Sequence, residues 1–128
     1  MGFLKARQAA RFKEGRRPQT DDEFVARCGF EPDGTAAVLV LAVRRVIGEC
    51  GSVDPAYIRD DDLWPEDLGK LDFWDSIDFL HFVFSVERAT GIKFRRDEDM
   101  QDFFDSGFSV SELIRRVVDK LEGAKPGV

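Results

Sequence analysis

The stretch from Trp74 to Phe94 constrains the fold of this chain of 128 residues more than any other segment. Asp75 is placed to cap a helix, Asp78 stands three positions later as in a capping box, and Gly91 ends the helix. Over the intervening turns the apolar side chains sweep an arc of about 220°, well beyond one buried stripe. A helix this apolar must pack against neighbours on several sides. Its apolar residues are Ile77, Phe79, Leu80, Phe82, Val83, Phe84, Val86 and Ala89.

Two other long helices are predicted, over residues 35–49 and 109–121. The first has apolar residues at helical spacing, and the second opens with a capping box formed by Ser109 and Glu112. The predicted inward positions of the first helix are Val38, Leu39, Ala42, Val43, Val46 and Ile47, and its predicted solvent positions are Arg44, Arg45 and Glu49.

Two short helices complete the predicted set. Thr20 forms a capping box with Glu23, and Gly29 ends that helix after about two turns. The other short helix covers residues 100–104 and is followed by a Ser-Gly pair. Because no convincing strand-like alternation is present, the fold class is predicted to be all-α.

A basic, partly helical extension is predicted for residues 1–31, ahead of a main domain over 32–123 and a tail over 124–128. Residues 1–17 hold six basic side chains and one acid in a weak amphipathic pattern. They are interpreted as a peripheral helix with its charges in water, and the alternative is contact with a membrane surface or nucleic acid.

The segment from Ser52 to Trp74 is acidic and contains two prolines, so it is predicted to be an irregular loop. Apolar residues along it are expected to hold it to the core. Its carboxylates suit a hard cation, but their spacing differs from the EF-hand loop, so they are interpreted as solvated charges and no metal is predicted. The anchors are Val53, Ile58, Leu63, Trp64 and Leu68, and the carboxylates are Asp60, Asp61, Asp62, Glu66, Asp67 and Asp72.

Charge and residue usage disfavour several function classes. The chain carries −6 overall, so the residues beyond the basic first 17 carry −11, and a basic protein surface is a better complement than nucleic acid. No apolar run is long enough to span a membrane, and no secretory signal is recognisable. Cys28 and Cys50 lack ligand spacing, so reduced thiols and a cytoplasmic location are expected. The single histidine, His81, has no neighbouring nucleophile, so no catalytic residue is predicted.

The run Asp67-Leu68-Gly69, followed by Asp75-Ser76-Ile77-Asp78 and Gly91-Ile92, resembles the acyl carrier protein motif. The similarity extends over residues 35–121 in the order of the helices. It implies an acyl-carrier-like four-helix bundle of three main helices and one short one, with a long loop between the first two, and a monomer. It also implies that Ser76 carries covalent 4'-phosphopantetheine, with Asp75 and Trp74 beside the attachment site.

The resemblance further implies a carrier, not an enzyme. Acyl intermediates would be held as thioesters on the arm for a specialised lipid, polyketide or related pathway. The implied partners are a phosphopantetheinyl transferase and acyl-transferring or acyl-processing enzymes. The alternative is a protein–protein interaction module with the same fold and no arm. The predicted partner-binding residues are Ile77, Asp78, His81, Phe84 and Arg88.

Three features depart from the family pattern. An insertion over residues 70–74 brings two aromatics next to Ser76, where they line an acyl pocket, shield the arm or only anchor the longer loop. The N-terminal extension has no counterpart, and its short helix is expected to cover part of the serine-headed helix through Phe24, Val25 and Cys28. The exposed stripe of the serine-headed helix is predicted to be nearly neutral, not acidic, and consists of Asp78, His81, Ser85 and Arg88.

Overall fold

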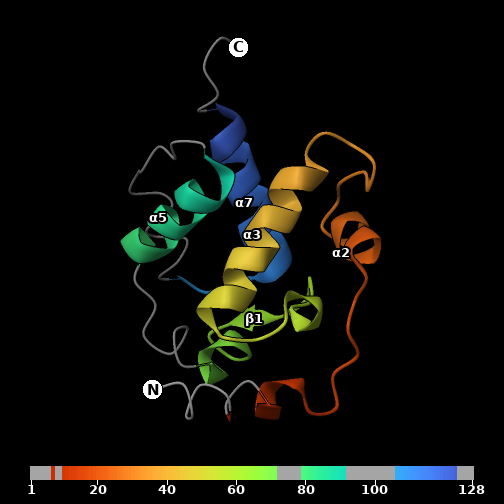
Figure 1. Ribbon diagram of the computed structural model, residues 1–128, viewed down its shortest axis with the longest axis vertical. Coiled ribbons are helices and arrows are strands. Elements are labelled where there is room, and N and C mark those ends of the chain that lie inside the picture. The colour runs from red at the N-terminus through yellow and green to blue at the C-terminus, as the bar shows by residue number, and fades with distance from the viewer. Residues whose placement is uncertain (1–6, 8–9, 72–78, 92–105, 124–128) are drawn as a thin grey trace.

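The computed structural model describes residues 7, 10–71, 79–91 and 106–123, and these are mostly helical (Figure 1). Helix α3 lies at the centre, with α5 on one side, α2 on the other and α7 behind it. The prediction of a mostly helical fold is confirmed, and the specific acyl-carrier-like bundle stays a prediction. The helices are α2 (Asp21–Arg27), α3 (Ala37–Cys50), α5 (Phe79–Thr90) and α7 (Val110–Gly123).

Two of the predicted helix starts are confirmed by their hydrogen bonds. The backbone N–H of Glu23 donates to Thr20 Oγ1 over 3.1 Å at the start of α2. At the start of α7 the cap is reciprocal: the N–H of Glu112 donates to Ser109 Oγ, and the N–H of Ser109 donates to Glu112 Oε1 over 3.0 Å. These bonds satisfy N–H groups that have no partner within the helix, so the two helices begin where their sequences specify.

Two predictions about the faces of α3 are wrong. Arg44, expected in solvent, is only 1 % exposed, and Val38, expected in the core, is 74 % exposed. The reason is that α2, α5, α7 and the following loop all contact α3, so only one narrow stripe of the helix reaches water. Val38 and Arg45 are seven residues apart and both lie on that stripe.

The loop after α3 is held to the core, as predicted, by Val53, Ile58 and Leu68, which are buried. Leu63 is an exception, because it belongs to a short strand and is exposed. The loop approaches α3 closely at Gly48, where an added Cβ would lie 2.8 Å from the carbonyl oxygen of Val53. Its short elements are the 3-10 helices Pro55–Tyr57 and Leu68–Lys70 and strand β1 (Leu63–Trp64), which pairs antiparallel with β2 (Phe108–Ser109).

Helix α2 does not cover α5, the described part of the serine-headed helix. Phe24, Val25 and Cys28 are buried as expected, but α2 packs on α3, and Figure 1 shows α5 on the opposite side of α3. The predicted contact is therefore wrong for α5, because the helix that α2 packs on is α3. The predicted helix over residues 100–104 lies outside the described residues.

Candidate functional site

The predicted attachment site lies outside the described residues, and this includes Trp74, Asp75, Ser76, Ile77 and Asp78. The structure describes the chain on both sides of it. On the N-terminal side Leu68 and Leu71 are fully buried, so the loop is fixed to the core shortly before the motif. On the C-terminal side, three positions after Ser76, Phe79 begins the described part of α5.

Helix α5 has one buried and one exposed face. Phe82, Val83 and Val86 are buried, and α5 packs against α3. His81 and Arg88 are exposed, as predicted for the neutral stripe, and Phe84 is 49 % exposed. The exposed face of α5 therefore offers both an apolar and a basic group to a partner.

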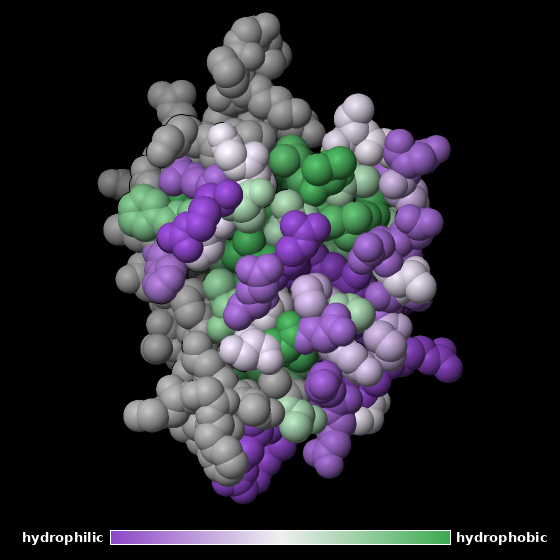
Figure 2. All heavy atoms as spheres, in the orientation of Figure 1, coloured by the Kyte–Doolittle hydropathy of each residue, from purple (hydrophilic) through white to green (hydrophobic). Residues whose placement is uncertain are grey.

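A cavity of about 380 Å³ lies between α3 and α5. We call it the α3–α5 groove, and the lining residues that matter below are Arg45, Glu49, Cys50, Ser85 and Arg88. In Figure 2 hydrophilic side chains lie over both helices on this face of the molecule. Arg45 and Arg88 are 43 positions apart in the sequence, and no local pattern indicates that they share a site.

Arg44 is the centre of a buried polar network. Its Nε donates to the carbonyl of Ile58 over 3.1 Å, and its Nη2 donates to the carbonyls of Gln19 and Ala56 over 3.0 and 3.1 Å. Its Nη1 pairs with Asp21 over 3.1 Å, and the guanidinium lies 4.2 Å from the centre of the Phe24 ring. Burial lowers the pKa of Arg44, and the carboxylate of Asp21 opposes that shift. Arg44 thereby connects α3 to three parts of the chain: helix α2, the residues just before α2, and the loop that follows α3.

The prediction that the loop carboxylates are solvated is wrong for Asp62, which is only 4 % exposed. Arg16 Nη1 lies 2.7 Å from Asp62 Oδ1, and the backbone N–H of Arg59 donates to Asp62 Oδ2 over 2.8 Å. Burial raises the pKa of Asp62, while the bond from Arg59 and the charge of Arg16 act to lower it. Hydrogen bonds to charged groups are stronger than neutral ones, so this pair fixes the extension to the loop.

Neither cysteine forms a disulfide. Cys28 is buried, and burial raises the pKa of its thiol from 9.0 to about 12, with the charge of Asp60 acting in the same direction. Cys50 is half-buried and lines the α3–α5 groove. The two thiols therefore differ in environment. Of the two, only Cys50 lines the groove, so the rate of its alkylation can be used to detect binding there.

The buried thiol predicts a pH effect on stability. Between pH 9 and 12 the Cys28 thiol ionises in the unfolded chain and stays protonated in the folded chain, so the folded chain binds more protons. The free energy of unfolding should therefore fall as the pH rises, with this thiol contributing a slope of up to about 1.4 kcal/mol per pH unit. Urea unfolding at several alkaline pH values should show a shallower slope for Cys28→Ala than for the wild type or Cys50→Ala. Equal slopes would contradict the assignment.

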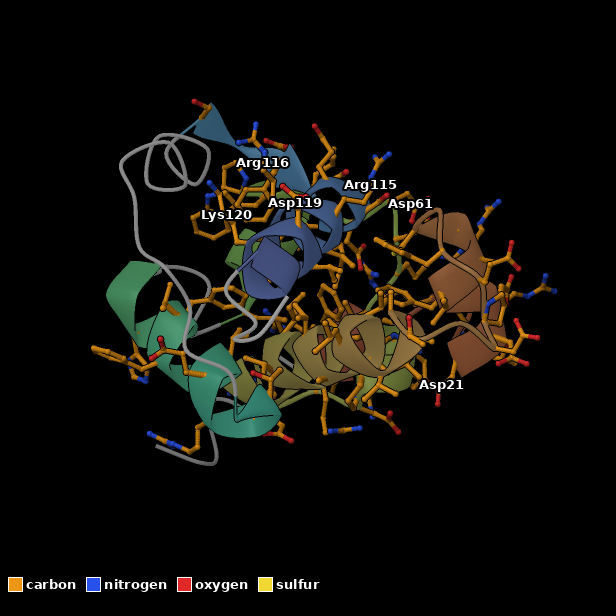
Figure 3. All side chains as sticks on the ribbon, turned by 90° about the horizontal axis from the view of Figure 1, so that it is seen from above. Asp21, Asp61, Arg115, Arg116, Asp119 and Lys120 are labelled. Atoms are coloured by element: carbon orange, nitrogen blue, oxygen red, sulfur yellow. The ribbon has the colours of Figure 1, made fainter. Side chains whose placement is uncertain are left out.

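A second cavity, of about 550 Å³, lies between the end of α2 and helix α7. Phe30 lines it together with Glu112, Arg115 and Asp119. Figure 3 shows Arg115, Arg116 and Asp119 on the side of α7 turned away from α3. The charges along this cavity are mixed in sign, and we assign it no ligand.

Comparison of the chain with protein-family models, with curated proteins and with solved structures gives no match. Within the described residues, no three or more His, Cys, Asp or Glu side chains are grouped to hold a metal ion. None of the described helices combines the length and the apolarity needed to cross a bilayer.

Proposed function

We propose that this chain is an acyl-carrier-like protein in which Ser76 carries a 4'-phosphopantetheine arm and acyl intermediates are held on the arm as thioesters. The observation that carries the proposal is the motif Asp75-Ser76-Ile77-Asp78 directly ahead of α5, a helix with one face against α3 and one face exposed. A carrier needs such an arrangement, because the helix must be held by the core and still be offered to partner enzymes.

The surrounding chain fits an attached arm in two respects. Leu68 and Leu71 are buried, so the segment that leads to the motif is fixed to the core only five residues before Ser76. His81, Phe84 and Arg88 of α5 are accessible to a partner protein. When bound, the arm supplies a thiol on a long tether, which raises the local concentration of the acyl group at a partner's active site. The chain itself contributes the attachment hydroxyl and the docking surface.

Ser76 is expected to be the single site of modification. Incubation of the full chain with coenzyme A, Mg²⁺ and a broad-specificity phosphopantetheinyl transferase should add the mass of one phosphopantetheine group. Ser76→Ala should remove the adduct completely, because no other hydroxyl occupies the motif. Ser85→Ala, also on the serine-headed helix, is the matched control and should be modified like the wild type. Intact-mass spectrometry measures both. An unmodified wild-type chain, or an adduct that survives Ser76→Ala, would refute the carrier function.

The second candidate is an interaction module that carries no arm. It is favoured by the half-exposed Phe84, which is suited to protein contact whether or not Ser76 is modified. The mass measurement separates the two candidates, because only a carrier needs the adduct.

A further inference from the structure

Arg45 and Arg88 are two basic side chains that line one groove. Both are exposed, and they come from different helices, α3 and α5. In the part of the chain that the structure describes, neither forms a hydrogen bond or an ion pair through its side chain. Arg16 and Arg44, by contrast, form ion pairs with carboxylates. Two exposed guanidinium groups that form no ion pair are available to bind an anion.

An apolar side chain lies next to these arginines. Phe84 is one helical turn from Arg88 and is 49 % exposed, so the two residues share a side of α5. Figure 2 also shows apolar surface at the outer edge of α5. A ligand that matches this surface carries both carboxylates and an apolar group, with the two kinds of group about one helical turn apart. An acidic amphipathic helix has this pattern.

Two features disfavour nucleic acid or another polyanion. Glu49 lines the same groove and would repel a chain of closely spaced phosphates, and the protein as a whole carries −6. A protein segment with a few carboxylates avoids this conflict, because its charges can be placed at the arginines alone. At physiological ionic strength charges beyond about 8 Å are largely screened, so the local arginines count for more than the net charge.

We propose that the α3–α5 groove binds an acidic amphipathic helix of a partner protein, with Arg45 and Arg88 pairing its carboxylates and Phe84 contacting its apolar face. The overall charge of the sequence favours a basic partner surface. This groove, in contrast, favours an acidic one, because Arg45 and Arg88 line it. The proposal rests on the proposed function in one respect, that α5 is the docking helix. It does not need the arm, and it is therefore tested on the Ser76→Ala chain.

The test uses a synthetic amphipathic helix of Glu, Ala and Leu, and the same peptide with Lys in place of Glu. The Glu peptide should bind the full-length Ser76→Ala chain in a fluorescence anisotropy titration, and at saturation it should slow alkylation of Cys50. Arg45→Glu with Arg88→Glu should weaken binding by about tenfold or more, because two attractive pairs become repulsive. Glu49→Gln should strengthen it by about twofold, because one repulsive charge is removed.

The matched control is Arg17→Glu with Arg115→Glu, which makes the same change in net charge at exposed residues outside the groove and should leave binding unchanged. If the charge-reversed chain does not fold, as judged by circular dichroism, Arg45→Gln with Arg88→Gln replaces it and should weaken binding by a smaller factor. Tighter binding of the Lys peptide, equal losses in the test and control pairs, or no saturable binding would overturn the proposal. Self-association of the chain that disappears in the charge-reversed variant would overturn it too, since the occupant would then be a second copy.

Discussion

Replacing Arg44 by methionine should lower the free energy of unfolding by about 3 kcal/mol or more. Methionine retains much of the volume but donates no hydrogen bonds. The carbonyls of Gln19 and Ile58 would lose the donor that Arg44 supplies, while the carbonyl of Ala56 would keep its bond from the backbone N–H of Gln19, and each buried unsatisfied group costs about 1–3 kcal/mol. Asp21 contributes less, because it is 71 % exposed and returns to water. Urea unfolding followed by circular dichroism measures the change.

Arg45→Met is the matched control for this substitution. Arg45 is the next residue of the same helix, it is exposed, and no carbonyl of the described chain depends on it. Its replacement should change the free energy of unfolding by no more than about 0.5 kcal/mol. Equal effects of the two substitutions would mean that the hydrogen bonds of Arg44 contribute nothing to stability.

Phe24→Ala should destabilise the chain by about 3–5 kcal/mol. Phe24 is 0 % exposed, and its ring lies against the Arg44 guanidinium, so truncation leaves a cavity and removes a cation–π contact. The control is Val38→Ala, which removes apolar atoms from an exposed position of α3 and should cost much less. Thermal and urea unfolding of the two variants give the comparison.

The Phe24 and Arg44 substitutions should not be additive. The two side chains are in contact, so the double variant should lose less stability than the sum of the single losses. Strict additivity would show that the two side chains are not coupled, and a small effect of Phe24→Ala alone would show that the extension is only loosely attached. The expected result instead makes α2 part of the folded core.

The sequence predicted the helix termini better than the helix surroundings. The caps at Thr20 and Ser109 depend on residues three positions apart, and such local patterns can be read directly. Arg44 could not be predicted in the same way, because its burial depends on carbonyls supplied by residues 14 positions after it and 25 before it. A charged residue is expected in solvent unless its partners are known, and these partners are backbone groups that leave no mark in the sequence.

The same distinction applies to the candidate site. The exposure of His81 and Arg88 followed from helical periodicity alone, and the structure agrees. The groove could not be predicted from periodicity, because Arg45 and Arg88 line one cavity only when α3 packs on α5. The predicted neighbour of the extension is wrong for a related reason: its apolar residues indicate burial, but periodicity does not say which helix buries them.

The position of the Arg44 partners along the chain has a consequence for the order of folding. They lie between Gln19 and Ile58, so all of them leave the ribosome before α5 and α7 do. We expect the arginine and its carbonyls to associate early during synthesis, since these contacts close short loops and ordering short loops costs little entropy. The strand pair β1–β2 joins residues more than 40 positions apart and can form only later. Helix α5, which follows the serine motif, would then dock on a surface that the N-terminal half of the chain has already formed.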